Sequence, residues 1–467
     1  AAAQCWQQAG DSAQAFRAGA AAAMAWLTAG DTQRSLEICD TLLARATSLH
    51  EQTEVRRVQT LGLVYTGKLC PALALLKPTH AAAITLGHTT WRGELAALGA
   101  HAAAALGDSV QAGLFLADEK SLPLDASDWK SNLTRLSVTA GALSFIGRVN
   151  DALQRTEASI ALADRPEARA EHATLESNAA SLLQQLGRIA QAHRRALRSL
   201  ELHTELGLRS GITGLAARMH VGLYGAGLGQ FDSAVRELDD CLKGFAELNA
   251  PARVRQVENH LIQVWTHLGQ PAKALQLLRS GGIDLSPLHR LRRATLAHDL
   301  AQMCGVEVAA PELPEQLEGI EPSVRAQHQI VQARALAAPE KLAAALQLEH
   351  EFAAQERQGC ALAAQVMRLD ALVELRDPAA AAMARHLQRE LVDHVPAITY
   401  WPQAQFSVHQ ALQATGQLQA ARRALADAWR WIAHARDQHV PPQLQRAFMT
   451  GNLVNATIQQ VWVDQQT

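Results

Sequence analysis

A pattern built on a single glycine recurs along this chain of 467 residues. An apolar stretch ends at the glycine, a mostly apolar residue follows two positions later, and an alanine usually follows five positions later. From the first to the seventh glycine the separations are 37, 40, 40, 40, 42 and 40 residues, a regularity that chance does not give. The glycines are Gly30, Gly67, Gly107, Gly147, Gly187, Gly229 and Gly269, and Gly416 marks a later copy.

Each copy predicts two antiparallel α-helices that reverse direction at the glycine. Glycine adopts the positive φ with which helices commonly end. The small alanine five positions later lets the second helix approach the first closely, as Ala234 does after Gly229. A single hairpin leaves apolar faces that only its neighbours can cover, so the hairpins stack. We therefore expect an all-α fold, an α-α superhelix of about ten to eleven helical hairpins.

One copy resembles the tetratricopeptide repeat. It reads Gly229-Gln230-Phe231-Asp232-Ser233-Ala234, with Gly222 seven residues before the first glycine. The period near 40 exceeds the usual 34 of that family, which implies helices longer by about one turn. The resemblance implies a tetratricopeptide-like solenoid in which the first helix of each hairpin lines a concave groove for a protein or peptide.

The pattern weakens between Gly269 and Gly416, and this divides the chain. Glycine and proline gather between Gly281 and Pro322, as expected of an irregular joint. We predict an N-terminal array over 1–285, an irregular joint or degenerate repeat over 286–325, and a second array with a capping segment over 326–467. Weak copies are placed near Gly305, Ala338 and Arg376.

The groove-facing positions follow from the same register. They lie 13, 10, 6, 3 and 2 residues before each glycine, on the helix face opposite the packing residues. The residues at these positions are mainly neutral amides and hydroxyls, with an apolar patch at two of them. Amides both donate and accept hydrogen bonds, which suits an extended peptide backbone or an uncharged polar effector, although the same amides could simply solvate an exposed face. The predicted binding residues are Ser177, Ser181, Gln184, Gln185, Met219, Leu223, Gln256, Asn259, Gln263 and His267, and Gln403, Phe406 and Gln410 hold equivalent positions before Gly416.

Composition argues against several classes of protein. Charged residues make up 19% of the chain, the formal net charge is −2, and no basic cluster appears, so we expect no direct contact with nucleic acid. No apolar run approaches the length of a membrane span. The six cysteines form no Cys-x-x-Cys pair, which argues against structural zinc and favours reduced thiols in the cytoplasm.

Motifs of catalytic or metal chemistry fail at decisive positions. Gly62 to Lys68 nearly matches a phosphate-binding loop, but Leu69 stands where Ser or Thr must follow the lysine. His50-Glu51 begins like a zinc-protease helix, but Glu54 occupies the place of the second histidine. An enzyme would need clustered acid and base residues, and none emerges. We predict no enzymatic activity, no cofactor and no metal site.

The two ends resemble the repeat region of large bacterial regulators in which a STAND-type NTPase precedes the repeats. The N-terminal likeness lies in Cys5 to Asp11 and Ala25 to Asp31. The C-terminal likeness begins at Val440-Pro441-Pro442 and ends at Asn452-Leu453-Val454-Asn455, where Leu453 replaces the more usual proline. The resemblance implies a fragment that senses an effector in its groove, with NTPase and DNA-binding parts upstream. A free-standing scaffold that docks other proteins remains the alternative.

Overall fold

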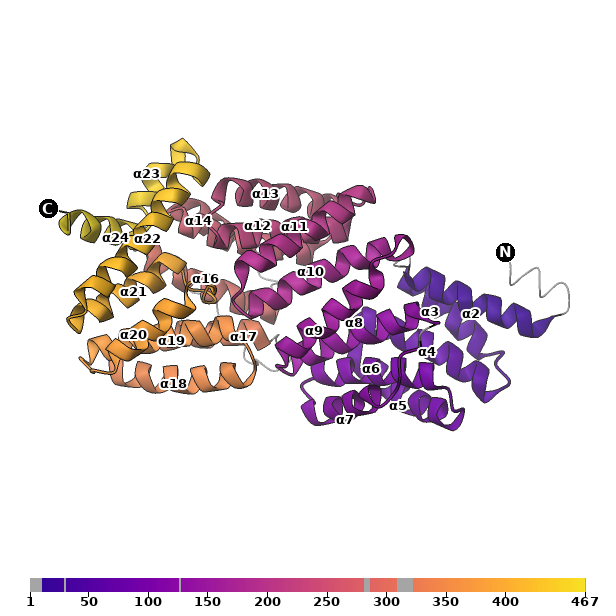
Figure 1. Cartoon of the computed structure of the whole chain (residues 1–467). Coiled ribbons are helices and arrows are strands. Elements are labelled where there is room, and N and C mark those ends of the chain that lie inside the picture. The colour runs from indigo at the N-terminus through magenta and orange to yellow at the C-terminus, as the bar shows by residue number, and fades with distance from the viewer. Residues whose placement is uncertain (1–10, 29–30, 126, 281–285, 309–321, 467) are drawn as a thin grey trace. The chain divides into compact units, whose positions relative to one another are not determined.

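The computed structural model describes residues 11–28, 31–125, 127–280, 286–308 and 322–466. Throughout these ranges the regular structure is helical, without any strand, which confirms the predicted all-α class of stacked helical hairpins (Figure 1). The chain divides into two compact units: unit 1 spans Ala1–Leu162 and unit 2 spans Ala163–Thr467. This division is independent of the predicted joint near residue 285, whose boundaries stay a prediction.

Unit 1 is a row of hairpins whose helices begin at polar caps. The side chains of Asp31, Asp108 and Asp128 each accept a main-chain N–H three residues later, and Ser48 with Glu51 forms a complete capping box. The helices are α2 (Ser12–Thr28), α3 (Thr32–Leu43), α4 (Leu49–Tyr65), α5 (Leu69–Thr85), α6 (Thr89–Ala105), α7 (Ser109–Lys120), α8 (Trp129–Phe145) and α9 (Val149–Ala163).

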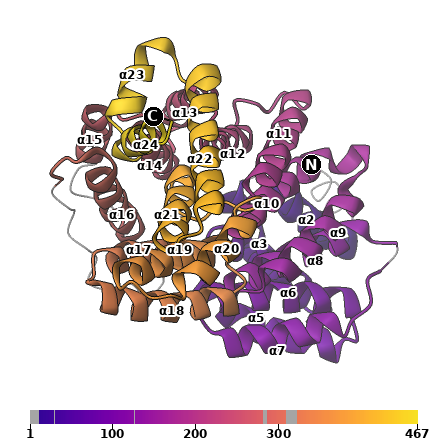
Figure 2. The ribbon, with the colours of Figure 1, turned by 60° about the vertical axis from the view of Figure 1, so that its left-hand side comes forward.

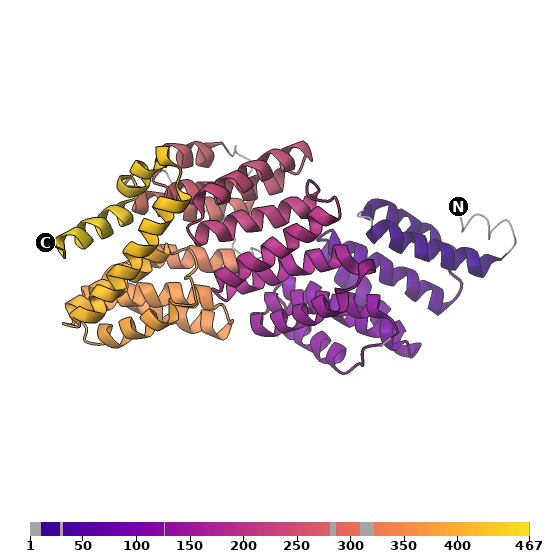
Figure 3. The ribbon, with the colours of Figure 1, turned by 45° about the horizontal axis from the view of Figure 1, so that its top comes forward.

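Unit 2 continues with helices of similar length. Figure 3 shows α10 to α14 as a side-by-side stack of long helices. The helices are η1 (Pro166–Ala168), α10 (Arg169–Gln185), α11 (Ile189–Glu205), α12 (Ile212–Gly227), α13 (Phe231–Glu247), α14 (Pro251–His267), α15 (Pro271–Arg279), α16 (Pro287–Cys304), α17 (Pro322–Arg334), α18 (Ala338–Ala354), α19 (Gln358–Glu374), α20 (Ala380–Glu390), α21 (Trp401–Ala414), α22 (Leu418–His439), α23 (Pro442–Thr450) and α24 (Leu453–Asp464).

The predicted reversals lie at the predicted glycines. Every one of them that the structure describes has a positive φ, between 64° and 84°, and ends the first helix of a hairpin. Gly30, the residues 281–285 just before the predicted joint and the residues 309–321 within it lie outside the described residues. Two of the weak copies also reverse with positive φ, at Gly305 (64°) and Arg376 (55°). The third, Ala338, is the first residue of α18, directly after a reversal.

The residues around these turns pack largely as the repeat requires. The alanine five residues after each described glycine is buried, which confirms the close approach of the paired helices. The residue two positions after the glycine is fully buried at Val149 and Phe231. At Leu418, however, the expected plug is wrong, because 57% of this residue is exposed where α22 begins.

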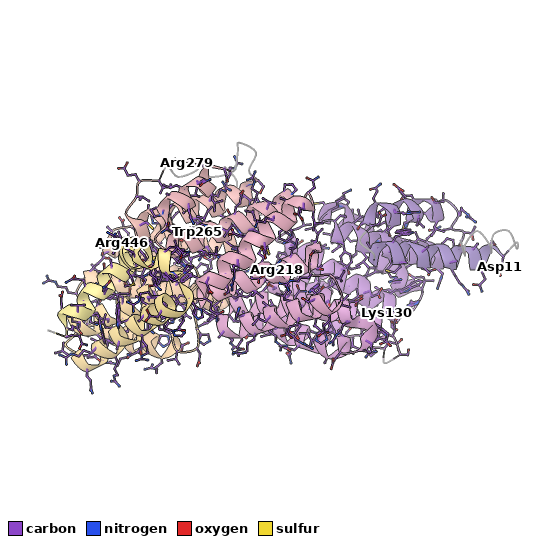
Figure 4. All side chains as sticks on the ribbon, turned by 90° about the horizontal axis from the view of Figure 1, so that it is seen from above. Asp11, Lys130, Arg218, Trp265, Arg279 and Arg446 are labelled. Atoms are coloured by element: carbon purple, nitrogen blue, oxygen red, sulfur yellow. The ribbon has the colours of Figure 1, made fainter. Side chains whose placement is uncertain are left out.

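Polar contacts tie the two helices of a hairpin together on their outer side. Arg218, labelled in Figure 4 with Trp265, donates to Glu237 and Asp240 of the paired helix at 2.6 Å each. The Lys273 ammonium lies 3.9 Å from the ring centroid of Trp265 within the next hairpin. Such contacts add to the apolar packing and set the register of the pair.

A buried ion pair stabilises the end of unit 1. Arg135 and Glu119 are 2% and 1% exposed, and their side chains meet at 3.0 Å. The Arg135 guanidinium also donates to the main-chain carbonyls of Glu119, Leu122 and Pro123. It thereby satisfies the carbonyl groups that the end of α7 and the following loop leave without helical partners.

Candidate functional site: an enclosed cavity in unit 2

Three successive turn glycines of unit 2 are also contact points for its C-terminal half. The carbonyl of Gly187 accepts a hydrogen bond from the main-chain N–H of Val395 at 2.8 Å. A Cβ atom at Gly229 would lie 3.0 Å from the ring of Trp431, and one at Gly269 would lie 2.2 Å from the carbonyl oxygen of Ala447. Figure 2 shows the corresponding C-terminal helices, α22 to α24, beside α12 to α14. Unit 2 therefore closes on itself, with a row of turns as the seam.

This closure leaves a cavity of about 310 Å³ inside unit 2. Its walls come from the first helices α10, α12, α14 and α16, and from α17. The starts of α11 and α19, Trp431 of α22, and the segment 395–401 that precedes and opens α21 complete them. Clefts and cavities of this size that carry a few convergent polar groups are the usual form of a ligand site.

Most of the predicted groove residues lie on the cavity wall. The side of α14 that faces it repeats at helical spacing, so that Gln256, Asn259, Gln263 and His267 share one face. α10 and α12 contribute the remaining members, and together the predicted residues on the wall are Ser181, Gln184, Gln185, Leu223, Gln256, Asn259, Gln263 and His267.

Two predicted residues do not reach the cavity. Met219 is 0% exposed and belongs to the hydrophobic core, and Ser177 is buried against the next first helix, where its hydroxyl meets His220 Nδ1 at 2.8 Å. Both stand ten residues before their glycine, as Asn259 does. At Ser177 the side chain meets the next first helix and at Met219 it joins the core, whereas Asn259 also lines the cavity. The expectation of an apolar surface patch at Met219 was therefore wrong, because core packing takes that side chain.

Neutral imidazoles stand among the amides. Burial lowers the pKa of His220 to about 4, of His260 to about 3 and of His267 to about 4, with Arg253 and Arg292 adding repulsion at the first two. Each ring therefore presents one donor and one acceptor at neutral pH. His220 and His260 stand nine residues before their glycines, directly after the predicted position at ten. They were not predicted from the sequence, although their place next to a groove position could have indicated them.

Several polar atoms on the α14 face lack hydrogen-bond partners within the described part of the chain. They are Asn259 Oδ1, His260 Nε2 and His267 Nδ1. Asn259 is 3% exposed, and its Nδ2 lies 3.4 Å from His289 Nδ1. A buried polar atom without a partner costs free energy, so the packing of α14 carries this cost at three side chains of the face.

The segment 395–401 was not predicted, because no repeat pattern marks it. Besides the bond of Val395 to Gly187, the N–H of Ala397 donates to the carbonyl of Gly359 at 2.8 Å. Ile398 has a φ of 47°, which is strained for a β-branched residue. Arg334 of α17 donates to the carbonyl of Ile398 and to the hydroxyl of Thr399, and these hydrogen bonds hold the segment in place.

Arg334 also faces a carboxylate of the cavity wall. Asp299 of α16 lies 3.9 Å from Arg334, and burial raises the pKa of this carboxyl to about 7 despite the guanidinium. Arg334 lines a second cavity of about 510 Å³, together with Gln403, Phe406 and Gln410, the groove positions predicted before Gly416. Thr399 lines both cavities.

Among the described residues no group of three or more His, Cys, Asp or Glu side chains is placed to hold a metal ion. No helix within the described ranges is long and apolar enough to cross a membrane.

No family model matches the sequence, and no curated protein matches it. Solved structures of similar fold are found. A Rap protein complexed with competence and sporulation factor aligns with a TM-score of 0.50 at 9% identity, over 83% of this chain and 99% of that one. The apo form of RapI aligns with a TM-score of 0.48 at 11% identity, over 77% and 98% of the two chains. At this identity the likeness concerns the fold alone, a superhelix of helical hairpins.

Proposed function

We propose that unit 2 is a binding module that captures a short extended peptide in its cavity. The observation that carries the proposal is the α14 face, where the amides Gln256, Asn259 and Gln263 and the neutral imidazoles of His260 and His267 line the cavity together. A peptide backbone offers N–H and C=O groups in alternation, and side chains that both donate and accept can follow it without a charge of their own.

The size of the cavity favours a short ligand over a folded partner. A stable interface between folded proteins covers roughly 800 Å² on each side. A cavity of about 310 Å³ holds a few residues at most. The free-standing scaffold, the alternative function, would need a broad open face, so we favour effector capture. The similar Rap structure is complexed with a named factor, which is consistent with a binding role for this fold.

In the full proposal the module is the effector sensor of a bacterial regulator of signal transduction or transcription, acts in the cytoplasm, and carries no catalytic activity of its own. The bound effector would act by favouring the closed form of unit 2 over an opened one, because a ligand shifts a conformational equilibrium only through its difference in affinity for the two states. The coding sequence upstream of Ala1 provides a direct check on the NTPase-linked arrangement.

The test begins with peptides selected from a random library on the full chain and measured by calorimetry. Replacing Gln256, Asn259 and Gln263 together by alanine should weaken their binding at least tenfold, while circular dichroism stays unchanged. The control replaces three exposed amides away from the cavity, in Gln276→Ala, Gln443→Ala and Gln460→Ala, and should bind as the wild type does. Equal affinity in both variants would reject the cavity as the binding site.

A further inference from the structure

Aromatic rings gather at one end of the cavity. Tyr400 and Trp431 are nearly perpendicular, at 87° with centroids 5.4 Å apart, and Trp401 lies 6.3 Å from Trp431 at 29°. The ring of His267 lies 4.8 Å from that of Tyr400. All four side chains line the cavity. We call Tyr400, Trp401, Trp431 and His267 the aromatic end.

The rings come from distant parts of unit 2. His267 ends α14, whereas Tyr400 and Trp401 lie at the start of α21 and Trp431 lies in α22. Trp401 Nε1 donates to the carbonyl of Leu391 at 3.1 Å, which fixes one ring, and Trp431 packs against the turn at Gly229. The aromatic end is therefore a rigid surface that forms only when the unit closes.

The chemistry of this surface differs from that of the rest of the cavity. The Gln256 and Gln263 side chains and their neighbours on α14 are polar, while the rings present apolar faces and edges. Ring edges carry partial positive charge and ring faces partial negative charge, so perpendicular rings accept a further ring edge to face or offset. An inserted aromatic side chain would bury a large apolar area at this end.

The charges on the wall argue against a cationic guest. The charged residues among the described lining are Arg292, Asp299 and Arg357, and Asp299 already faces Arg334. A lysine or arginine entering the cavity would come near the guanidinium groups of Arg292 and Arg357. It would gain cation–π attraction from the rings but meet like charge on the wall.

From this arrangement we infer that the aromatic end is a specificity pocket for one aromatic side chain of the bound peptide, whose backbone runs along the α14 face. This rests on the proposed function and adds the chemical class of the ligand. Because the cavity holds only a few residues, a single buried anchor contributes much of the affinity, as aromatic hot spots do in interfaces.

The experiment uses the full chain and a set of blocked pentapeptides, N-acetyl-Ser-Gly-X-Gly-Ser-amide, with X as Phe, Leu, Ala, Lys or Glu. Binding is measured by calorimetry, so that ring fluorescence plays no part. We expect the Phe peptide to bind at least tenfold more tightly than the Ala peptide, with Leu intermediate and with Lys and Glu no better than Ala.

Two variants separate the pocket from the polar wall. Trp401→Leu keeps an apolar side chain but removes a ring, and should reduce the preference for the Phe peptide over the Ala peptide at least threefold. Gln263→Ala should weaken the Phe and Ala peptides by the same factor. Equal binding of the Phe and Ala peptides, or tighter binding of the Lys peptide, would overturn the aromatic pocket and leave the peptide cavity standing. If none of the five peptides binds, both the aromatic pocket and the proposed function are rejected.

Discussion

The side-chain amide of Asn452 donates a hydrogen bond to the main-chain carbonyl of His267 at 2.9 Å, across 185 residues of sequence. His267 is the last residue of α14, so its carbonyl has no partner within the helix. The same amide caps α24, because its Oδ1 accepts the N–H groups of Val454 and Asn455. A single buried asparagine therefore ends one helix, begins another, and joins the two halves of unit 2.

The close contact between Gly269 and Ala447 predicts that replacing Gly269 by alanine destabilises the fold more than replacing Gly416 does. Gly269 and Gly416 have similar positive φ values, 64° and 76°. A Cβ at Gly269 would meet the carbonyl of Ala447 at 2.2 Å, whereas a Cβ at Gly416 would meet nothing within 4 Å. Gly269→Ala should lower the free energy of unfolding by about 2 to 4 kcal/mol, and Gly416→Ala by about 1 kcal/mol, in urea denaturation. Equal losses would mean that the seam does not form at Gly269.

The cavity histidines predict a stability that depends on pH. Their pKa values of about 3 to 4 in the folded chain lie below the ordinary 6.5, so the unfolded chain binds more protons between these values. Their contribution is complete above pH 6.5 and is lost as the pH falls toward 4, by up to about 1.4 kcal/mol per pH unit for each histidine. Asp299, with its raised pKa, acts in the opposite direction.

The comparison that isolates this effect is a variant with His220→Gln, His260→Gln and His267→Gln. Because Asp299 is retained in both proteins, its contribution cancels between them. The free energy of unfolding of the variant should fall less steeply than that of the wild type between pH 6.5 and 4. Parallel curves would show that these rings are charged in the folded chain.

The buried ion pair of Arg135 and Glu119 predicts that removing the arginine lowers the stability of unit 1. Arg135→Leu leaves the buried Glu119 carboxylate with only the longer contact to Arg155 at 3.4 Å, and it leaves the carbonyls of Leu122 and Pro123 without the guanidinium donor. We expect a loss of about 3 to 5 kcal/mol. Hydrogen exchange should show it as faster exchange in α7 and α8. A variant with both Arg135→Leu and Glu119→Leu should recover part of the loss, since no lone charge then remains buried.

The left-handed backbone conformation of Arg376 predicts that glycine at this position stabilises the fold. Arg376 is exposed and has a φ of 55° at the turn after α19. Arg376→Gly removes the cost of that conformation and should raise the free energy of unfolding by about 0.5 to 1 kcal/mol. Ala382→Gly, at an exposed position within α20, should lower it by about 1 kcal/mol. A destabilising Arg376→Gly would show that the arginine side chain makes a contact worth more than the strain.

The amino-acid sequence by itself determined the hairpins, because their signals are local. A glycine needed for positive φ, an alanine needed for close approach and a mostly apolar residue two positions after the turn all act within about 40 residues of one another. The same register placed Gln256, Gln263 and His267 on one face of α14, since helical periodicity follows from the spacing alone. The prediction for Met219 was wrong, because the packing of successive hairpins decides whether a side chain at this position faces the groove or the core.

Only the tertiary structure decided that this face lies inside a cavity. The segment 395–401, with Tyr400 and Trp401, carries no repeat, and Trp431 gives no sign of its partner at Gly229. These contacts join residues about 130 to 210 positions apart, and they depend on the summed small rotations between hairpins, which no local pattern encodes. Unit 2 closes on itself because these small rotations add up along the row of hairpins. The cavity and its aromatic end exist only because the unit is closed.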